Sequence, residues 1–437
     1  MRFSRGKRRM APVAAAAAMA LIIVACGAGE EAATQPEAAT EDDESPDVDE
    51  TGEDENGEGE PSGDPIVLGG TLGLSGILAD ASGHYLETYE LWAEQVNESG
   101  GLLGRPVEVL VYDDESDATA VRGFYERLLQ EDDVDLLMGP YATFMTLPVI
   151  PLVEESEMVM WMAGAVSVAS NRSSDWLVSS YTYQDDDFAL GFFEMLDDLP
   201  DDQKPERLGV LALQNPYTLN MMNGVEGEGG ILNMAEERGY EVVLAEEYAP
   251  DTTDYSPLIR SAEEADVDAL IVANLLGDGL EIARAVNERG FNPDILCMCG
   301  SQVTLLEPWA GLGDAGERVF GTTMAWHTDN YPGYDELEQH FADMGVSPLP
   351  TYALAAYTAL QVAEQAVRET GTLDQAALRD YVMGGAVFDT VVGEVQFDED
   401  GIPGWDSIML QVQDGENEVV WPADRATSEP RFPLVTE

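Results

Sequence analysis

Residues 138–146, MGPYATFMT, place an aromatic ring and two hydroxyl groups directly after an apolar run that begins at Val134 and is typical of a buried strand. A turn at Gly139-Pro140 ends the run, and Thr143 stands where a helix is expected to begin. A strand-to-helix junction leaves backbone N–H groups free, and with a neighbouring hydroxyl they can hold an anion such as a carboxylate. The alternative is an ordinary helix cap made by a threonine, beside a surface tyrosine.

Catalytic chemistry finds no support in the residue pattern. The three histidines, His84, His327 and His340, are scattered and lack the spacing of metal ligands. Residues 73–77, GLSGI, lack the final glycine of a nucleophile elbow, and no phosphate loop or dinucleotide fingerprint follows an expected strand. We therefore predict that the protein is not an enzyme and uses no metal and no cofactor. A histidine or a nucleophile–base pair lining a cleft would revive the enzyme hypothesis.

The first 25 residues have the order of a bacterial export signal. A basic region that includes Arg2 and Lys7 precedes an apolar segment, residues 11–24, which is too short and too alanine-rich for a comfortable membrane span. Residues 23–27, IVACG, resemble the lipobox of bacterial lipoproteins, which implies cleavage before Cys26 and lipidation of its thiol. Two or more acyl chains would anchor the protein stably to the cell membrane, on its extracytoplasmic side. The alternative is an ordinary signal peptide with an incidental cysteine.

Residues 26–64 form an acidic segment directly behind the lipidation site. From Gly27 to Asp64 there are 16 acidic residues and no basic or aromatic residue. Such a segment cannot bury enough apolar surface to fold, and its charges repel one another, so we expect an extended, disordered tether. A functional acidic tail is the alternative, but the position favours a spacer.

Acidic residues also dominate the rest of the chain, and the formal net charge of the protein is −65. Such a surface repels nucleic acids and anionic lipids, so we expect no nucleic-acid partner. It also suggests life at high salt, where counterions screen the repulsion.

Two cysteines remain after Cys26, and they lie two positions apart in the stretch LCMCG. Cys297 and Cys299 would share one face of an expected strand, where a bridge between them would be strained. We interpret them as two small buried apolar residues.

Apolar runs of strand length alternate with amphipathic stretches of helical spacing from residue 65 onward. The expected strands are at 66–72, 107–112, 134–138, 158–162, 208–213, 241–247, 269–273, 295–299 and 319–325. The expected helices are at 83–99, 118–130, 143–154, 218–238, 258–264, 280–289, 333–344 and 352–368, and a hairpin-like tail follows at 393–405 with Gly401 in its turn. This alternation predicts an α/β protein whose parallel sheets carry helices on both faces.

The pattern restarts after about residue 182, which predicts two similar, doubly wound lobes. We expect lobe 1 to hold residues 65–182 and 326–368, and lobe 2 with a closing tail to hold residues 183–325 and 369–437, with approximate boundaries. Ligands of open parallel sheets bind at the carboxyl ends of the strands, so a ligand cleft is expected between the lobes.

Several stretches together resemble the leucine/isoleucine/valine-binding proteins of ABC importers, which have the type 1 periplasmic binding fold. The stretches are LGLSGILADASG, VNESGGLLGRPVEVLVYDDESD, LLMGPYATFMTLP, TYQDDDFALGF and VGEVQFDEDG, which follow that family's order and spacing between about Ile66 and Trp421. The resemblance implies two lobes with a hinge that close on a small solute and deliver it to a membrane permease. The segments that cross between the lobes are expected near residues 180, 300 and 350.

The resemblance also implies which residues of the first lobe contact the solute. They are Ser75, Tyr141, Ala142, Thr143, Gly164 and Ser167. Backbone N–H groups and the hydroxyl of residues 141–143 would hold a solute carboxylate through charge-assisted hydrogen bonds. In the next loop, WMAGAVSVAS, the family's hydroxyl position itself falls on Val166, with Ser167 one residue further on.

In the second lobe, the implied contacts are Tyr217, Asn274, Ser301, Gln302 and Trp326. Tyr217 would place its ring on the solute, and the alternative is a residue that caps the following helix. Ser301 and Gln302 stand where the family's amino-acid binders place an acid. Trp326 would form an aromatic wall of the cleft, and packing in the core is the alternative.

These features predict a monomeric, extracytoplasmic solute-binding lipoprotein of an ABC importer, with a small carboxylate of hydrophobic body as its ligand. A branched-chain or other apolar amino acid comes first because of the resemblance. However, an ammonium needs a counter-charge in a closed cleft, and the acids nearest to Gln302, Asp278 and Glu307, are displaced by several positions, although Asp278 or backbone carbonyls could substitute. Aromatic acids or amides without an ammonium are the alternative ligands, and a sensory receptor subunit with the same clamp is the alternative role.

Overall fold

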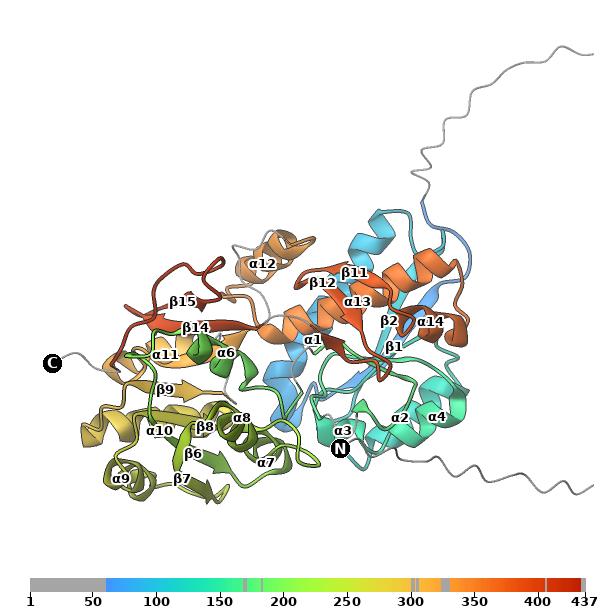
Figure 1. Cartoon of the computed structure of the whole chain (residues 1–437). Coiled ribbons are helices and arrows are strands. Elements are labelled where there is room, and N and C mark those ends of the chain that lie inside the picture. Colours follow the sequence, from blue (N-terminus) through green and yellow to red (C-terminus); the bar gives the residue numbers. More distant parts are fainter. Residues whose placement is uncertain are drawn as a thin grey trace, which may run out of the picture. The chain divides into compact units, whose positions relative to one another are not determined.

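A computed structural model of the chain describes residues 60–167, 171–181, 184–299, 303, 306–323, 331–404 and 407–433. Two larger β-sheets and one small sheet organise this part of the chain (Figure 1). Each of the two larger sheets is built mainly from parallel strands, as the alternation of apolar runs and helical stretches predicts.

The first sheet has five parallel strands in the order β2-β1-β3-β4-β5. Its strands are β1 (Ile66–Leu72), β2 (Val107–Asp113), β3 (Leu136–Met138), β4 (Met160–Met162) and β5 (Leu177–Ser179). The connecting helices are η1 (Gly76–Leu78), α1 (Ala79–Glu98), α2 (Val121–Gln130), α3 (Thr143–Thr146) and α4 (Ile150–Ser156).

Both faces of the first sheet are buried. Leu136 and Trp161 belong to one hydrophobic core, whereas their chain neighbours Leu137 and Met160 belong to another. Because successive side chains of a strand point to opposite faces, the two cores lie on opposite sides of the sheet. The predicted doubly wound arrangement is therefore confirmed for this sheet.

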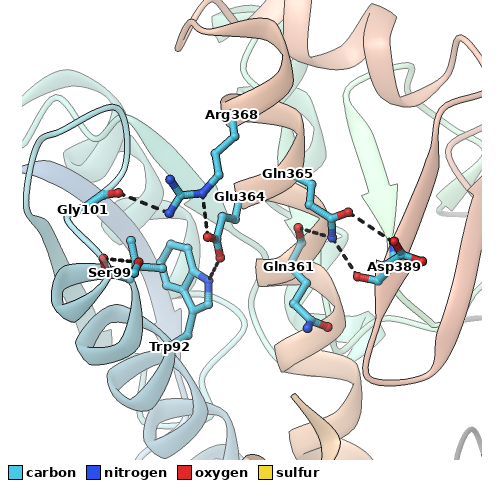
Figure 2. Close-up of polar contacts among 9 residues, drawn as sticks. Trp92, Ser99, Gly101, Gln361, Glu364, Gln365, Arg368 and Asp389 are labelled. Atoms are coloured by element: carbon cyan, nitrogen blue, oxygen red, sulfur yellow. Dashed lines mark hydrogen bonds and ion pairs between the residues drawn. The ribbon is translucent and has the colours of Figure 1, made fainter. Parts of the chain in front are cut away.

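Helix α13 (Thr351–Thr370) closes the first core by packing against α1. The Trp92 indole N–H donates to Glu364 Oε2 over 2.9 Å, and Arg368 Nε donates to Glu364 Oε1 over 2.8 Å (Figure 2). Arg368 also donates to the carbonyl of Gly101 over 3.2 Å. A buried indole and a helix-borne carboxylate thus join two helices that are far apart in the sequence.

Residues beyond α13 also pack in the first core. They come from α14 (Gln375–Val382) and from the antiparallel strands β11 (Val387–Thr390) and β12 (Gly393–Phe397). Strand β13 (Pro403–Gly404) pairs with β12, and α12 (Tyr334–Asp343) precedes α13. Gln365 of α13 donates to the carbonyl of Asp389 over 2.8 Å and accepts from its N–H over 3.2 Å (Figure 2). The expected division assigned residues 369–404 to lobe 2, whereas Phe388 and Val395 lie in the core of the first sheet. The expected hairpin is present, with Gly401 at a φ of +70° in its turn.

The second sheet has seven strands in the order β15-β14-β10-β9-β8-β6-β7, of which β14 and β15 run antiparallel to their neighbours. Its strands are β6 (Arg207–Leu213), β7 (Glu241–Tyr248), β8 (Ala269–Ala273), β9 (Ile295–Met298), β10 (Phe320–Thr323), β14 (Ile408–Gln413) and β15 (Glu416–Trp421). Its helices are α6 (Leu190–Asp198), α7 (Pro216–Asn223), α8 (Ile231–Arg238), α9 (Ser256–Glu264), α10 (Leu276–Arg289), α11 (Leu306–Ala310) and η2 (Gly313–Ala315). Val210 and Leu211 enter different cores, so this sheet is also covered on both faces.

Two helices that were predicted to be continuous are each divided into two shorter helices. The helix expected at 143–154 is broken between α3 and α4, where Pro148 lacks the N–H that a helix interior needs. The helix expected at 218–238 is divided into α7 and α8 by the glycine-rich residues 224–230. Gly224 has a φ of +74° and Gly230 a φ of +76°, a conformation that ends a helix and that other residues rarely adopt.

The chain first passes from the first core to the second between β5 and α6, close to the crossing expected near residue 180. It returns between β10 and α12 and crosses again between β13 and β14. The crossing expected near residue 300 is wrong, because β9 and β10 on either side of it belong to the second sheet. The crossing expected near residue 350 is also wrong, because α12 and α13 both pack in the first core.

Candidate functional site

The expected carboxylate site lies at the carboxyl end of β3. Ala142 has a φ of +80° and a ψ of +142°, a strained conformation for a residue with a side chain. Its N–H donates to the carbonyl of Gly164 over 3.1 Å, so this group is already used within the protein. Thr143 is partly exposed, and within the described residues its hydroxyl has no protein partner. The single turn of α3 adds little helix dipole, so an anion held here would depend on individual hydrogen-bond donors such as the Thr143 hydroxyl.

Gly164, in the loop after β4, is in close contact with Tyr141. A Cβ atom added to Gly164 would lie 2.8 Å from Tyr141 Cδ2 and 2.9 Å from its Cα, too close for any side chain. The glycine therefore allows the β4 loop to support the tyrosine directly.

Tyr141 belongs to a cluster of tyrosines on the first sheet. Its ring centroid lies 5.1 Å from that of Tyr85 and 5.5 Å from that of Tyr352 on α13. The Tyr85 hydroxyl donates to the carbonyl of Ala163 over 2.7 Å. Burial, together with neighbouring phenols that include Tyr181, raises the pKa of Tyr85 and of Tyr141 well above the ordinary tyrosine value. The cluster is therefore neutral and combines apolar rings with hydroxyl groups, and within it Tyr85 is buried whereas Tyr141 and Tyr352 are partly exposed.

Tyr217 lies on α7, which belongs to the second lobe, and its phenol interacts electrostatically with residues near the tyrosine cluster. Its pKa is raised, first by burial and then by Tyr181, Asp185 and Tyr352, so residues of both sheets act on one phenol. The helix cap of α7 is a different residue, because Asn215 Oδ1 accepts from the N–H of Thr218 over 3.0 Å. The alternative role of Tyr217 as the cap is thus excluded.

Asn274 lies at the carboxyl end of β8 and is fully buried. Its Nδ2 donates to the carbonyl of Leu275 over 2.7 Å, while its Oδ1 has no hydrogen-bond partner within the described part of the chain. A buried acceptor without a partner is rare and calls for a donor, which a ligand can supply.

Asp278, the expected substitute acid, is a structural residue in this conformation. Its Oδ1 accepts from the N–H of Leu275 over 2.9 Å at the start of α10, and its Oδ2 accepts from the Tyr248 hydroxyl. Burial raises the pKa of Asp278 above the ordinary value for an aspartate. Both carboxylate oxygens therefore already serve the protein.

Sequence reasoning assigned no role to Asp185, which the structure places among these loops. The Asp185 side chain is buried on the segment that crosses from β5 to α6. Its N–H donates to the carbonyl of Val166 over 2.6 Å, and its Oδ2 accepts from Asn220 Nδ2 over 2.8 Å. The sequence signal for Asp185 is a run of aspartates between a buried strand and the apolar helix α6. Acids in such a position are brought into the interior and must then be paired.

Two other predicted contacts, Ser75 and Ser167, have hydrogen bonds to other residues of the first lobe. Ser75 is exposed, and its N–H and hydroxyl donate to Asp113 at the end of β2. Ser167 is partly exposed and its carbonyl accepts from the N–H of Asn171 over 2.8 Å. The residues Cys26, Ser301, Gln302, Trp326 and His327 lie outside the described residues.

A cavity of about 440 Å³ lies beside two of the crossing segments. Its lining includes Arg172, Asp187, Phe397, Ile402 and Ser407, and it includes none of the predicted solute contacts. The candidate solute site is instead defined by loops at the carboxyl ends of the strands.

Three further observations on the described residues concern the thiols, metal binding and membrane crossing. Cys297 and Cys299 are buried free thiols, as predicted, and burial raises the pKa of Cys297 well above the ordinary cysteine value. No cluster of three or more acidic, histidine or cysteine side chains in the described ranges is placed to hold a metal ion. None of the helices among these residues has the length and apolar character needed to cross a membrane.

The protein has two doubly wound α/β sheets, and the chain passes between them several times. Polar loops follow the carboxyl ends of the strands. This architecture is the one found in the class of bilobed solute-binding proteins. The chain belongs to the periplasmic binding protein family, whose model matches residues 65–417. Within it, the relatives identify the type 1, branched-chain amino acid group of ABC importer substrate-binding proteins, which implies an extracytoplasmic location.

Three known proteins illustrate this similarity. The Leu/Ile/Val-binding protein homolog 7 of Brucella abortus is 25% identical over 391 residues, which cover 85% of this chain and 95% of that protein. LivJ of Streptococcus pneumoniae, solved in complex with isoleucine, has a TM-score of 0.65 at 18% identity and covers 82% of this chain and 100% of its own. A solute-binding protein of Rhodopseudomonas palustris, solved with 3,4-dihydroxybenzoic acid, has a TM-score of 0.64 at 17% identity and covers 81% of this chain and 95% of its own.

Proposed function

We propose that this protein captures a small carboxylate with a hydrophobic body and delivers it to the permease of an ABC importer. The observation that supports the proposal is the position of Thr143 two residues after Tyr141, which belongs to a neutral tyrosine cluster, at the carboxyl end of β3. A hydroxyl that has no partner among the described residues suits the carboxylate, and the rings suit an apolar body. Tyr217 from the second sheet would complete the enclosure when the lobes close around a hinge.

A branched-chain or other apolar amino acid is the first ligand that we propose. The family membership supports it, as does the isoleucine found in LivJ of Streptococcus pneumoniae. The buried acceptor of Asn274 supports a ligand that carries a hydrogen-bond donor as well as a carboxylate.

Aromatic acids are the second candidate. A protein of the same fold binds 3,4-dihydroxybenzoic acid, and the partly exposed rings of Tyr141 and Tyr352, with buried Tyr85 beside them, offer a face on which an aromatic ring can pack. The transport role is the same for both ligand classes.

A thermal-shift screen of apolar amino acids beside aromatic and aliphatic acids tests the ligand class, since a ligand that binds the folded state raises the melting temperature. Thr143→Val should weaken the ligand so identified by about tenfold or more, through the loss of one charge-assisted hydrogen bond. Thr253→Val, at an exposed threonine of the second lobe, is the matched control and should bind as the wild type does. Melting shifts with sugars or polyamines alone, or unchanged binding by Thr143→Val, would contradict the proposal.

We also propose that lipidated Cys26 anchors a monomer to the outer side of the cell membrane, with residues 27–64 as spacer. Cys26→Ala should yield an exported protein that no longer partitions with membranes. Wild-type protein that is free in the culture medium and unacylated by mass spectrometry would refute the anchor.

A further inference from the structure

The segment that leads from β5 to α6 contains three consecutive aspartates, Asp185 to Asp187, and two neighbouring residues in it are bound to opposite lobes. The N–H of Asp185 donates to the carbonyl of Val166, in the loop after β4 of the first lobe, over 2.6 Å. The carbonyl of Asp186 accepts from the N–H of Gly230, at the start of α8 in the second lobe, over 2.6 Å. The backbone between these two hydrogen bonds is therefore a pivot of the hinge.

The side chain of Asp186 is buried at this pivot. It is 6% exposed, and its Oδ1 has no hydrogen-bond partner within the described part of the chain. The loop between α7 and α8 covers it, because a Cβ atom added to Gly229 would lie 2.9 Å from Asp186 Cβ and 3.1 Å from its Cγ. The acids of that loop, Glu226 and Glu228, are exposed to solvent. A buried oxygen without a partner disfavours the ionised carboxylate more than the neutral carboxyl group.

The charged groups that act on Asp186 come from both sides of the hinge. Burial is the largest cause of its raised pKa, followed by the charges of Asp187 and Asp185 on its own segment. Arg172, between β4 and β5 of the first lobe, acts in the opposite direction, as does the N–H of Asp186 itself. This cation also acts on Asp187, and its Nε lies 3.3 Å from Oδ2 of Asp400 in the turn between β12 and β13. One arginine thus serves several acids, and the pKa of Asp186 rises from 3.8 to about 6.

Protonation of Asp186 is therefore linked to the arrangement of the lobes. The described arrangement holds the proton more tightly than one in which water reaches the carboxylate, where the pKa returns toward 3.8. A raised pKa favours the described arrangement fully below pH 3.8, and this advantage is lost as the pH rises through about 6. In this arrangement Tyr352 of the first lobe acts on Tyr217 of the second, so the lobes are near enough for residues of the cleft to interact.

We propose that Asp186 is a proton switch of the hinge. Its neutral carboxyl group keeps the two lobes together, and its ionisation favours a rotated arrangement that admits water to the carboxylate. A solute held between the lobes then binds more tightly in mildly acidic surroundings, because lobe closure and protonation favour each other. The inference goes beyond the proposed function, since the hinge responds to protons even without a solute.

Small-angle scattering of the full chain at pH 5 and pH 8, without solute, tests the switch. High salt in both samples screens the general repulsion of an acidic surface. The wild type should have a smaller radius of gyration at pH 5 than at pH 8, whereas Asp186→Asn should be compact at both. Asp202→Asn removes an exposed charge of the second lobe and is the matched control, which should respond to pH as the wild type does.

Two further variants change the charge beside the switch in opposite senses and keep the test valid if Asp186→Asn does not fold. Arg172→Gln removes the cation that lowers the pKa of Asp186, so the midpoint of the compaction should move to higher pH. Asp187→Asn removes an acid that raises this pKa, so the midpoint should move to lower pH. Midpoints that do not move in either variant would contradict the switch.

Calorimetric titration with L-leucine at the same two pH values adds a functional measurement. Two pKa units allow at most about a hundredfold change, and we expect the wild type to bind about tenfold tighter at pH 5 than at pH 8. Asp186→Asn should show less than about a threefold difference. A wild type whose radius is the same at both pH values, or Asp186→Asn that expands at pH 8 as the wild type does, would overturn the inference and leave the proposed function intact. Failure to bind L-leucine or any other carboxylate would overturn the proposed function, while the scattering result would still decide on the switch.

Discussion

Replacement of Asp186 by asparagine should stabilise the protein at neutral and alkaline pH. Asp186 is 6% exposed, and its Oδ1 is buried with no hydrogen-bond partner within the described residues. Burial first, and then the charges of Asp187 and Asp185, raise its pKa from 3.8 to about 6, while Arg172 acts in the opposite direction. The folded state therefore holds this proton more tightly than the unfolded chain does.

The sign and size of the effect follow from this difference. A raised pKa contributes stability that is fully present below pH 3.8 and is lost as the pH rises through about 6. Two pKa units correspond to about 3 kcal/mol, and partial solvent screening lowers this to about 2 kcal/mol. Asp186→Asn keeps the shape of the side chain without its charge, so it should raise the free energy of unfolding by about 2 kcal/mol at pH 8 and by little at pH 4.

Urea unfolding of both proteins from pH 4 to pH 8 measures this difference. Asp202→Asn removes an equal charge from an exposed turn and controls for the general repulsion of an acidic protein. Added salt should reduce the effect of the control more than that of Asp186→Asn, because buried charge is screened less. Stability curves of Asp186→Asn and wild type that run parallel across this pH range would refute the reasoning.

Three further predictions concern the tyrosine loops and the first core. Ala142→Gly should raise the melting temperature and the free energy of unfolding by about 1 kcal/mol, because glycine adopts a φ of +80° without strain, and a loss of stability would contradict this. Gly164→Ala should cost about 1–3 kcal/mol and weaken ligand binding, since its methyl group would displace Tyr141; calorimetric titration with wild-type affinity would show that the contact is not needed. Trp92→Phe should lower the free energy of unfolding by about 1–3 kcal/mol, as it leaves Glu364 without its indole donor, and Trp92→Phe combined with Glu364→Gln should recover part of the loss in urea unfolding.

Much of the fold could be predicted because strands and helices leave a local signal. The strand expected at 269–273 is β8 at the same residues, since an apolar run bounded by polar residues marks a buried strand wherever it packs. Tyr141, Thr143 and Tyr217 could be placed at strand ends for the same reason. Their roles toward a ligand, and those of Ser301, Gln302 and Trp326, stay predictions.

The parts of the fold and of the site that could not be predicted depend on contacts between residues far apart in the sequence. Such contacts leave no local pattern. Phe388 is in the core of the first sheet because α13 lies beside it, and nothing in its own neighbourhood of the sequence indicates that. Asp185 resembles the many solvated acids of this chain until Val166 and Asn220 are brought to it. The conformation of Ala142 is likewise imposed by its surroundings, since alanine does not favour a positive φ.

The hydrogen bond between Trp92 and Glu364 joins residues that are 272 positions apart. A ribosome makes the chain from its N-terminus, so the first lobe has all five strands of its sheet long before α13 and β12 exist to cover one face. Pairings over such a distance slow folding. The face of the first sheet that α13 and β12 cover can therefore be buried only after most of the chain has been made.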